Sequence, residues 1–115
     1  MNRTLVTIGS DPRTSPRPAE AIRIAAGAGS WKKTEISLLL RGPAGHALSE
    51  FADELVDEDN FNRYLPIIAE WGRPIYVGED FEDMDVLRDS PWKYEVVSAA
   101  KIAQLYLEHD SFIQM

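Results

Sequence analysis

Short apolar runs alternate along the chain with longer amphipathic segments, and this alternation predicts the fold class. The apolar runs combine β-branched and aliphatic residues and stop at turn residues, which is typical of buried strands. Five strands are predicted, at residues 4–8, 35–40, 74–77, 94–97 and 111–114. The end of the second run, residues 38–40, is apolar without alternation, which indicates an interior strand of a parallel sheet.

Three segments between these strands have apolar residues at helical spacing. Helices are predicted at residues 16–28, 62–71 and 99–108. Ser15 and Ser98 stand where the first and last helices need an N-cap, and Pro16 suits a first helical position.

The middle of the chain has a weaker pattern. Residues 46–59 are predicted to form a short helix followed by an acidic loop. Either Asn60 or Asn62 is expected to cap the next helix. Pro66 is tolerable there if the helix begins at Asn62, because amides of the first turn have no partner within the helix.

The alternation predicts a three-layer α/β/α domain with a five-stranded parallel sheet. The connecting segments are mostly long enough for helical crossovers between parallel strands. With 115 residues, no internal repeat and no linker, we expect one domain over residues 1–115.

Composition narrows the class of partner. The formal net charge of -7 argues against nucleic acid and membrane surfaces, because both require clustered Lys and Arg. No apolar run approaches the length of about 18 residues that a membrane span needs, and the first ten residues do not resemble a signal peptide. The chain has no cysteine, which excludes thiol chemistry and disulfides and favours a cytoplasmic location.

Both ends of the chain resemble the DsrE/DsrF-like (DsrEFH-like) family. The resemblance rests on the strand at residues 5–8 with its serine-containing loop, and on the Ser98-capped helix that leads through Asp110 into residues 111–114. Flavodoxin-like domains share much of this pattern. The resemblance implies a five-stranded parallel sheet and a homo-oligomer. Sulfur-relay members carry a cysteine in the loop after the third strand, here residues 78–85, so their persulfide role does not carry over.

Ligands of open parallel sheets bind at the carboxyl ends of the strands. Backbone amides and two arginines at this edge offer positive potential to a small anion. The predicted ligand-binding residues are Ser10, Asp11, Arg13, Arg41, Gly42 and His46. Neither a dinucleotide-binding nor a phosphate-loop motif is present, so a solvated turn is the simpler interpretation of residues 9–13.

His46 is a candidate acid–base group because histidine changes charge near neutral pH. No nucleophile or metal-ligand spacing accompanies it, and we expect a surface loop residue. His109 is expected at a helix end, where a positive charge favours the helix dipole.

The acidic residues 79–85 do not form a calcium loop. Counted from Asp80, the sixth and twelfth positions hold Asp85 and Pro91, where glycine and glutamate are required. We interpret this segment as a solvated loop, and we expect no metal and no cofactor.

Two classes of function follow. The first is a non-catalytic, homo-oligomeric DsrE-like protein that binds a small ligand, such as an anion, or a protein partner. The alternative is a flavodoxin-type nucleotide-binding domain or small enzyme that uses Ser10, Asp11 and His46. The first is favoured because no nucleophile–base pair is visible. Large apolar residues near element ends either cap the core or supply an oligomer contact; these are Trp31, Trp71, Trp92 and residues 112–115.

Overall fold

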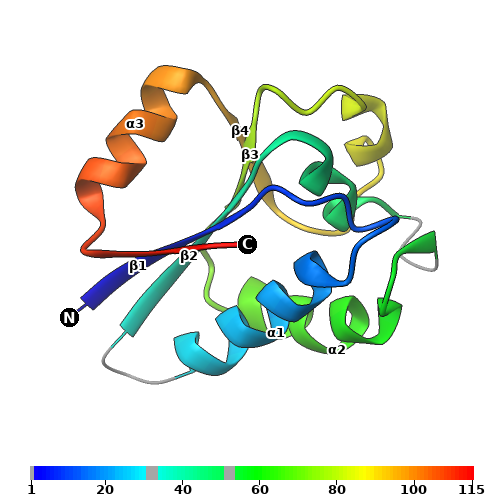
Figure 1. Ribbon diagram of the computed structural model, residues 1–115, viewed down its shortest axis with the longest axis horizontal. Helices are drawn as coiled ribbons and strands as arrows, with labels where there is room; N and C mark the ends of the chain where they lie inside the picture. Colours follow the sequence, from blue (N-terminus) through cyan, green and yellow to red (C-terminus); the bar gives the residue numbers. More distant parts are fainter. Residues whose placement is uncertain (1, 31–33, 51–53) are drawn as a thin grey trace.

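The computed structural model describes residues 2–30, 34–50 and 54–115, which form one sheet with helices on both faces (Figure 1). The strands are β1 (Asn2–Ile8), β2 (Thr34–Leu40), β3 (Ile75–Gly78), β4 (Tyr94–Val97) and β5 (Ser111–Gln114). All of them pair in parallel, in the order β4-β3-β2-β1-β5. The predicted three-layer α/β/α fold with a five-stranded parallel sheet is confirmed.

The handedness of the crossovers decides which face each helix covers. The helices are α1 (Arg17–Gly29), α2 (Glu58–Ala69) and α3 (Ala99–Glu108). The connections through α1 and α2 advance across the sheet in one direction, and right-handed crossovers then place both helices on the same face. The connection through α3 returns from β4 at one edge to β5 at the other, so α3 lies on the opposite face (Figure 1).

The interior strands are buried on both faces because both are covered. In β1, Val6 and Ile8 join the larger core beneath α1 and α2, whereas Leu5 joins the smaller core beneath α3. Leu39 of β2 belongs to the smaller core and its neighbour Leu40 to the larger one. The prediction of an interior strand at residues 38–40 is therefore confirmed, since β2 lies between β1 and β3.

The start of α2 differs from the prediction. The helix begins at Glu58, after Asp57 in the left-handed conformation (φ 57°), and not at Asn62. Asn60 does not cap the helix, because it lies within the first turn; its side-chain amide donates to the carbonyl of Ala19 in α1 (3.3 Å). Pro66 lies inside the helix. It is tolerated there because Pro66 and Asn62 are both exposed, so water can reach the Asn62 carbonyl that loses its donor.

The short helix predicted at the start of residues 46–59 is misplaced, whereas residues 55–57 form a turn, as expected for the loop that was to follow it. A 3-10 helix, η1 (Gly42–Leu48), comes directly after β2, and Gly42 enters it with a φ of 52°. A second 3-10 helix, η3 (Met84–Leu87), lies in the connection between β3 and β4 that was predicted as an acidic loop. The sequence pattern missed both elements because they are too short for a helical period to be visible.

The tryptophans that the structure describes serve the core. Trp71 and Trp92 are half-buried and pack against the larger hydrophobic cluster. The Trp71 ring occupies the space beside Gly29 where a Cβ would stand, so the ends of α1 and α2 approach closely. Trp31 lies outside the described residues.

Within residues 2–30, 34–50 and 54–115, no helix has both the length and the apolarity that a membrane crossing requires.

Candidate functional site

The loops that follow β1, β2 and β3 converge at the carboxyl edge of the sheet, because these strands are neighbours in the sheet order. Two side-chain contacts join the second loop to the third. His46 in η1 lies 2.9 Å (Nε2 to Oδ2) from Asp83, and Arg41 Nε donates to Asp80 Oδ2 at 3.3 Å.

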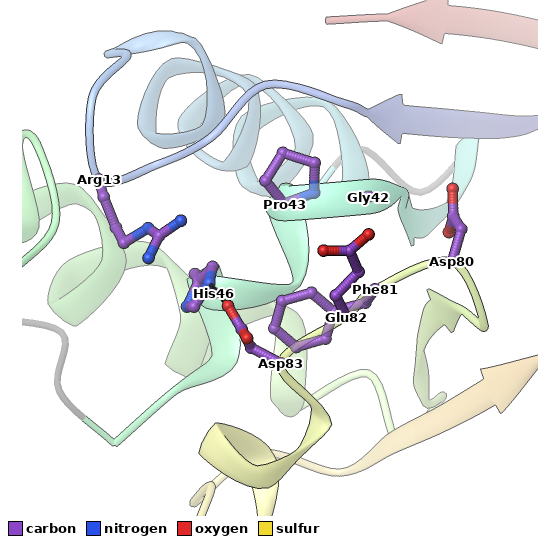
Figure 2. Close-up of a pocket in the computed structure, with 8 residues that line it drawn as sticks. All are labelled: Arg13, Gly42, Pro43, His46, Asp80, Phe81, Glu82 and Asp83. Atoms are coloured by element: carbon purple, nitrogen blue, oxygen red, sulfur yellow. Dashed lines mark hydrogen bonds and ion pairs between the residues drawn. The ribbon is translucent and has the colours of Figure 1, made fainter.

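A cavity of about 380 Å³ opens between these loops (Figure 2). Its lining combines charged side chains with the backbone of η1: Arg13, Gly42, Pro43, His46, Asp80, Phe81, Glu82 and Asp83. A second cavity, of about 230 Å³, shares three of these residues and adds Ser49, Glu54, Leu55 and Val86. Arg13, His46 and Asp83 line both cavities and therefore form a shared wall between them.

His46 is fixed in this wall. It is only 6% exposed, and its ring meets the Phe81 ring edge-on, with 5.0 Å between centroids and an interplanar angle of 86°. A Cβ on Gly45 would stand 2.5 Å from the Phe81 ring, so only glycine allows this packing. The expectation that His46 is a surface loop residue is wrong, because the winding of η1 turns the side chain against the loop after β3.

The contact with Asp83 defines the hydrogen-bonding state of His46. An ionised carboxylate only accepts hydrogen bonds, so the Nε2 atom of His46 carries the hydrogen in this contact. In the neutral imidazole, Nδ1 is then an acceptor. The other histidine lies far along the chain: His109 is buried at the end of α3, where its Nδ1 donates to the carbonyl of Leu105 (2.6 Å).

Arg13 is held within its own loop by Asp11. The guanidinium donates through Nη2 and Nε to the two carboxylate oxygens, at 2.9 and 3.1 Å. The hydrogen bond from Arg13 is the largest cause that holds the pKa of Asp11 below its ordinary value of 3.8. The arginine is thus already paired with an anion of the protein.

The structure brings together most of the residues predicted for ligand binding. Arg13, Gly42 and His46 line the larger cavity, and Asp11 and Arg41 contact lining residues. Ser10 does not line it, because its hydroxyl donates to the carbonyl of Met115 (3.1 Å) and connects the loop after β1 to the end of β5. That these residues bind a ligand stays a prediction.

Sequence reasoning missed the contribution of the acidic loop. Asp80, Phe81, Glu82 and Asp83 supply half of the larger cavity's lining, although the segment was interpreted as solvated. Phe81 is buried, and its side chain anchors the loop while the three carboxylate residues stay exposed. The signal that locates this loop is its position after the third strand, not its charge. Among the described residues, no group of three or more metal-ligating side chains is arranged to hold an ion.

The geometry defines a class of fold: an all-parallel, five-stranded α/β/α domain with its cavity at the strand ends. The crystal structure of the YchN protein from E. coli is similar, with a TM-score of 0.81 over 100% of each chain. The two sequences are 17% identical, so the likeness is one of fold. No protein-family model matches the sequence, and no curated protein matches it either.

Proposed function

We propose that this protein is a non-catalytic member of the DsrE-like proteins that binds a small polar molecule at the strand-end cavity and performs no persulfide chemistry. One observation carries the proposal. Three loops from different parts of the chain enclose a cavity of about 380 Å³, and its wall contains the contact between the buried His46 and the exposed Asp83. The volume lies in the lower part of the range of about 300–1,000 Å³ that is common for small-molecule sites.

The loop after β3 supports the part of the proposal that concerns sulfur. Sulfur-relay proteins of the family that the sequence resembles carry their cysteine in this loop. Here the loop supplies Asp80, Glu82 and Asp83 to the cavity, and the whole sequence contains no cysteine. Carboxylates suit the binding of a polar ligand and do not accept sulfane sulfur as a thiolate does.

A homo-oligomer in the cytoplasm belongs to the same proposal. Leu107 on α3 and Phe112 on the edge strand β5 are 87% and 46% exposed, and burying them in a contact would favour association. The cytoplasmic location rests on the cysteine-free composition.

Filling the cavity tests the proposal. Pro43 is exposed on the cavity wall, so Pro43→Trp adds a large side chain without entering the core. A protein-free small-molecule extract of the expression host is added to the labelled protein, and amide chemical shifts are recorded. We expect shifts at Gly42, His46 and Glu82 that Pro43→Trp abolishes.

Pro91→Trp is the matched control, because Pro91 is exposed and lines neither cavity. This variant should keep the shifts of the wild-type protein. The proposal would be contradicted if the extract moved no cavity amide, or if Pro43→Trp responded as Pro91→Trp does. Native mass spectrometry of the same samples reports the oligomeric state.

The contact of the buried His46 with Asp83 also favours a second candidate, an acid–base enzyme. A carboxylate that orients a histidine beside a cavity is an arrangement used in proton transfer. The described lining of the larger cavity contains no serine, threonine, lysine or tyrosine, so His46 would act on water or on the substrate itself. His46→Gln would then abolish turnover and spare binding.

A further inference from the structure

The two cavities are rich in negative charge. Asp80, Glu82 and Asp83 line the larger one, and Glu54 and Asp83 line the smaller one. Among the described lining residues of both, Arg13 is the one arginine or lysine, and its guanidinium is already engaged by Asp11. The cavities therefore present an excess of carboxylate oxygen to any molecule that enters them.

The carboxylates in this wall are hydrogen-bond acceptors. One of them, Asp83, is held by the contact of its Oδ2 with His46 Nε2 (2.9 Å). Figure 2 shows the Asp83 carboxylate turned toward His46 and the Glu82 carboxylate extending into the space beside Gly42. A ligand that satisfies these groups must bring hydrogen-bond donors of its own.

A small anion fits this wall less well. The sequence-based expectation of an anion relied on the positive charge of Arg13 and Arg41. In the structure the two guanidinium groups are paired with Asp11 and Asp80, and these carboxylates offset the positive charge that an anion would need. The formal net charge of -7 adds long-range repulsion for anions and attraction for cations.

We propose that the ligand is a small organic cation with N–H donors, such as an alkylammonium or guanidinium compound, bound between η1 and the acidic loop after β3. The inference rests on the proposed function, because it names the class of molecule that the same cavity takes. Glu82 and Asp83 contact the cation, and His46 positions Asp83 through the Nε2 contact of 2.9 Å.

A matched series of four-carbon probes tests the charge. The series consists of 1,4-diaminobutane, the uncharged 1,4-butanediol and the dianion succinate, and inorganic phosphate is added as a compact anion. Amide chemical shifts and calorimetry are measured on the full-length protein. We expect diaminobutane alone to shift Gly42, Glu82 and Asp83, with an affinity that falls as salt rises.

Removing one charge locates the site. Glu82→Gln keeps the size of the side chain and should weaken diaminobutane binding roughly three- to tenfold, as for a partly exposed charged contact. Glu70→Gln is the matched control, because Glu70 is exposed at the end of α2 and lines neither cavity. It should leave the affinity unchanged.

The possible outcomes separate the two proposals. If succinate or phosphate shifted the amides of the cavity residues and diaminobutane did not, the proposal that the ligand is a cation would be contradicted. The proposal that the cavity binds a ligand would still be supported. Equal weakening by Glu82→Gln and Glu70→Gln would show diffuse attraction to an acidic protein and would also overturn the inference. If none of the probes changes the amide chemical shifts of the cavity residues, the inference is wrong. The proposed function is tested separately, by the experiment with the small-molecule extract and Pro43→Trp.

Discussion

The two ends of the sheet both carry charged side chains, but they use them differently. At the amino ends of the strands, Glu35 accepts from Arg3 Nε at 2.9 Å and lies 3.6 Å from Arg73 Nη1. We call Arg3, Glu35 and Arg73 the basal cluster. Its two arginines also bind the backbone: Arg3 donates to the carbonyl of Glu108, and Arg73 donates to the carbonyl of Ile36. The Arg73 guanidinium lies over the Trp71 ring, 5.4 Å from its centroid.

At the carboxyl ends, two contacts between loops each join only two side chains. Arg41 with Asp80 and His46 with Asp83 hold loops beside one another, and a cavity remains between them. None of the three basal residues lines either of the two cavities there. Hydrogen bonds to backbone carbonyls therefore make the basal cluster part of the scaffold, whereas the pairs between loops leave carboxylate acceptors available to a ligand.

The largest effect on stability is expected from a substitution that disturbs the packing of the acidic loop at the carboxyl ends of the strands. Gly45→Ala places a methyl group 2.5 Å from the Phe81 ring, and such overpacking lowers the free energy of unfolding by about 1–3 kcal/mol. The variant should also lose the amide chemical-shift changes that a ligand causes at the cavity residues, because Phe81 anchors the acidic loop. Gly27→Ala is the control: no atom lies within 4 Å of its Cβ, and alanine should raise helix stability by about 0.5–1 kcal/mol. Equal denaturation curves for both variants would contradict the packing argument.

A smaller effect is expected at the amino end. Glu35→Ala removes the shared partner of Arg3 and Arg73, and we expect the free energy of unfolding to fall by about 1 kcal/mol. Ligand binding should be unchanged, because the basal cluster lies at the opposite end of the strands. Glu95→Ala, at an exposed position of β4, should alter stability less. If Glu35→Ala changed the amide chemical shifts of the cavity residues, the basal cluster would not be independent of the ligand site.

The smallest effect concerns the pairing that occupies Arg13. Because Arg13 lowers the pKa of Asp11, the stability from this pair is present above the ordinary value of 3.8 and is lost as the pH falls through the lower folded value. The contribution is small, since the Arg13 side chain is 46% exposed and the pair is screened by solvent. In a carboxyl NMR titration, Arg13→Gln should raise the Asp11 midpoint, and Arg23→Gln should leave it in place. A midpoint unaffected by Arg13→Gln would show that Arg13 is free for an anion.

Features of the fold that depend on residues close together in the chain could be predicted from the sequence. The apolar runs predict the strands most clearly at β1 and β2, because a strand buried on both faces needs consecutive apolar side chains whatever its partners are. Ser98 is the N-cap of α3 as predicted, with its hydroxyl accepting from the amide of Lys101 at 3.3 Å. Both signals lie within a few residues and need no knowledge of distant segments.

Features that depend on contacts between distant segments could not be predicted from the sequence, because they follow from the packing of the folded chain. The start of α2 is supported by Asn60, whose side-chain amide donates to the carbonyl of Ala19 in α1. Helix propensity depends on local sequence and does not predict this contact. The burial of His46 and its contact with Asp83 require the ends of β2 and β3 to lie side by side. The alternation of elements predicts that loops meet at one edge, but it does not specify which side chains face each other. The pairing of side chains in the site therefore follows from the strand order and from the winding of η1.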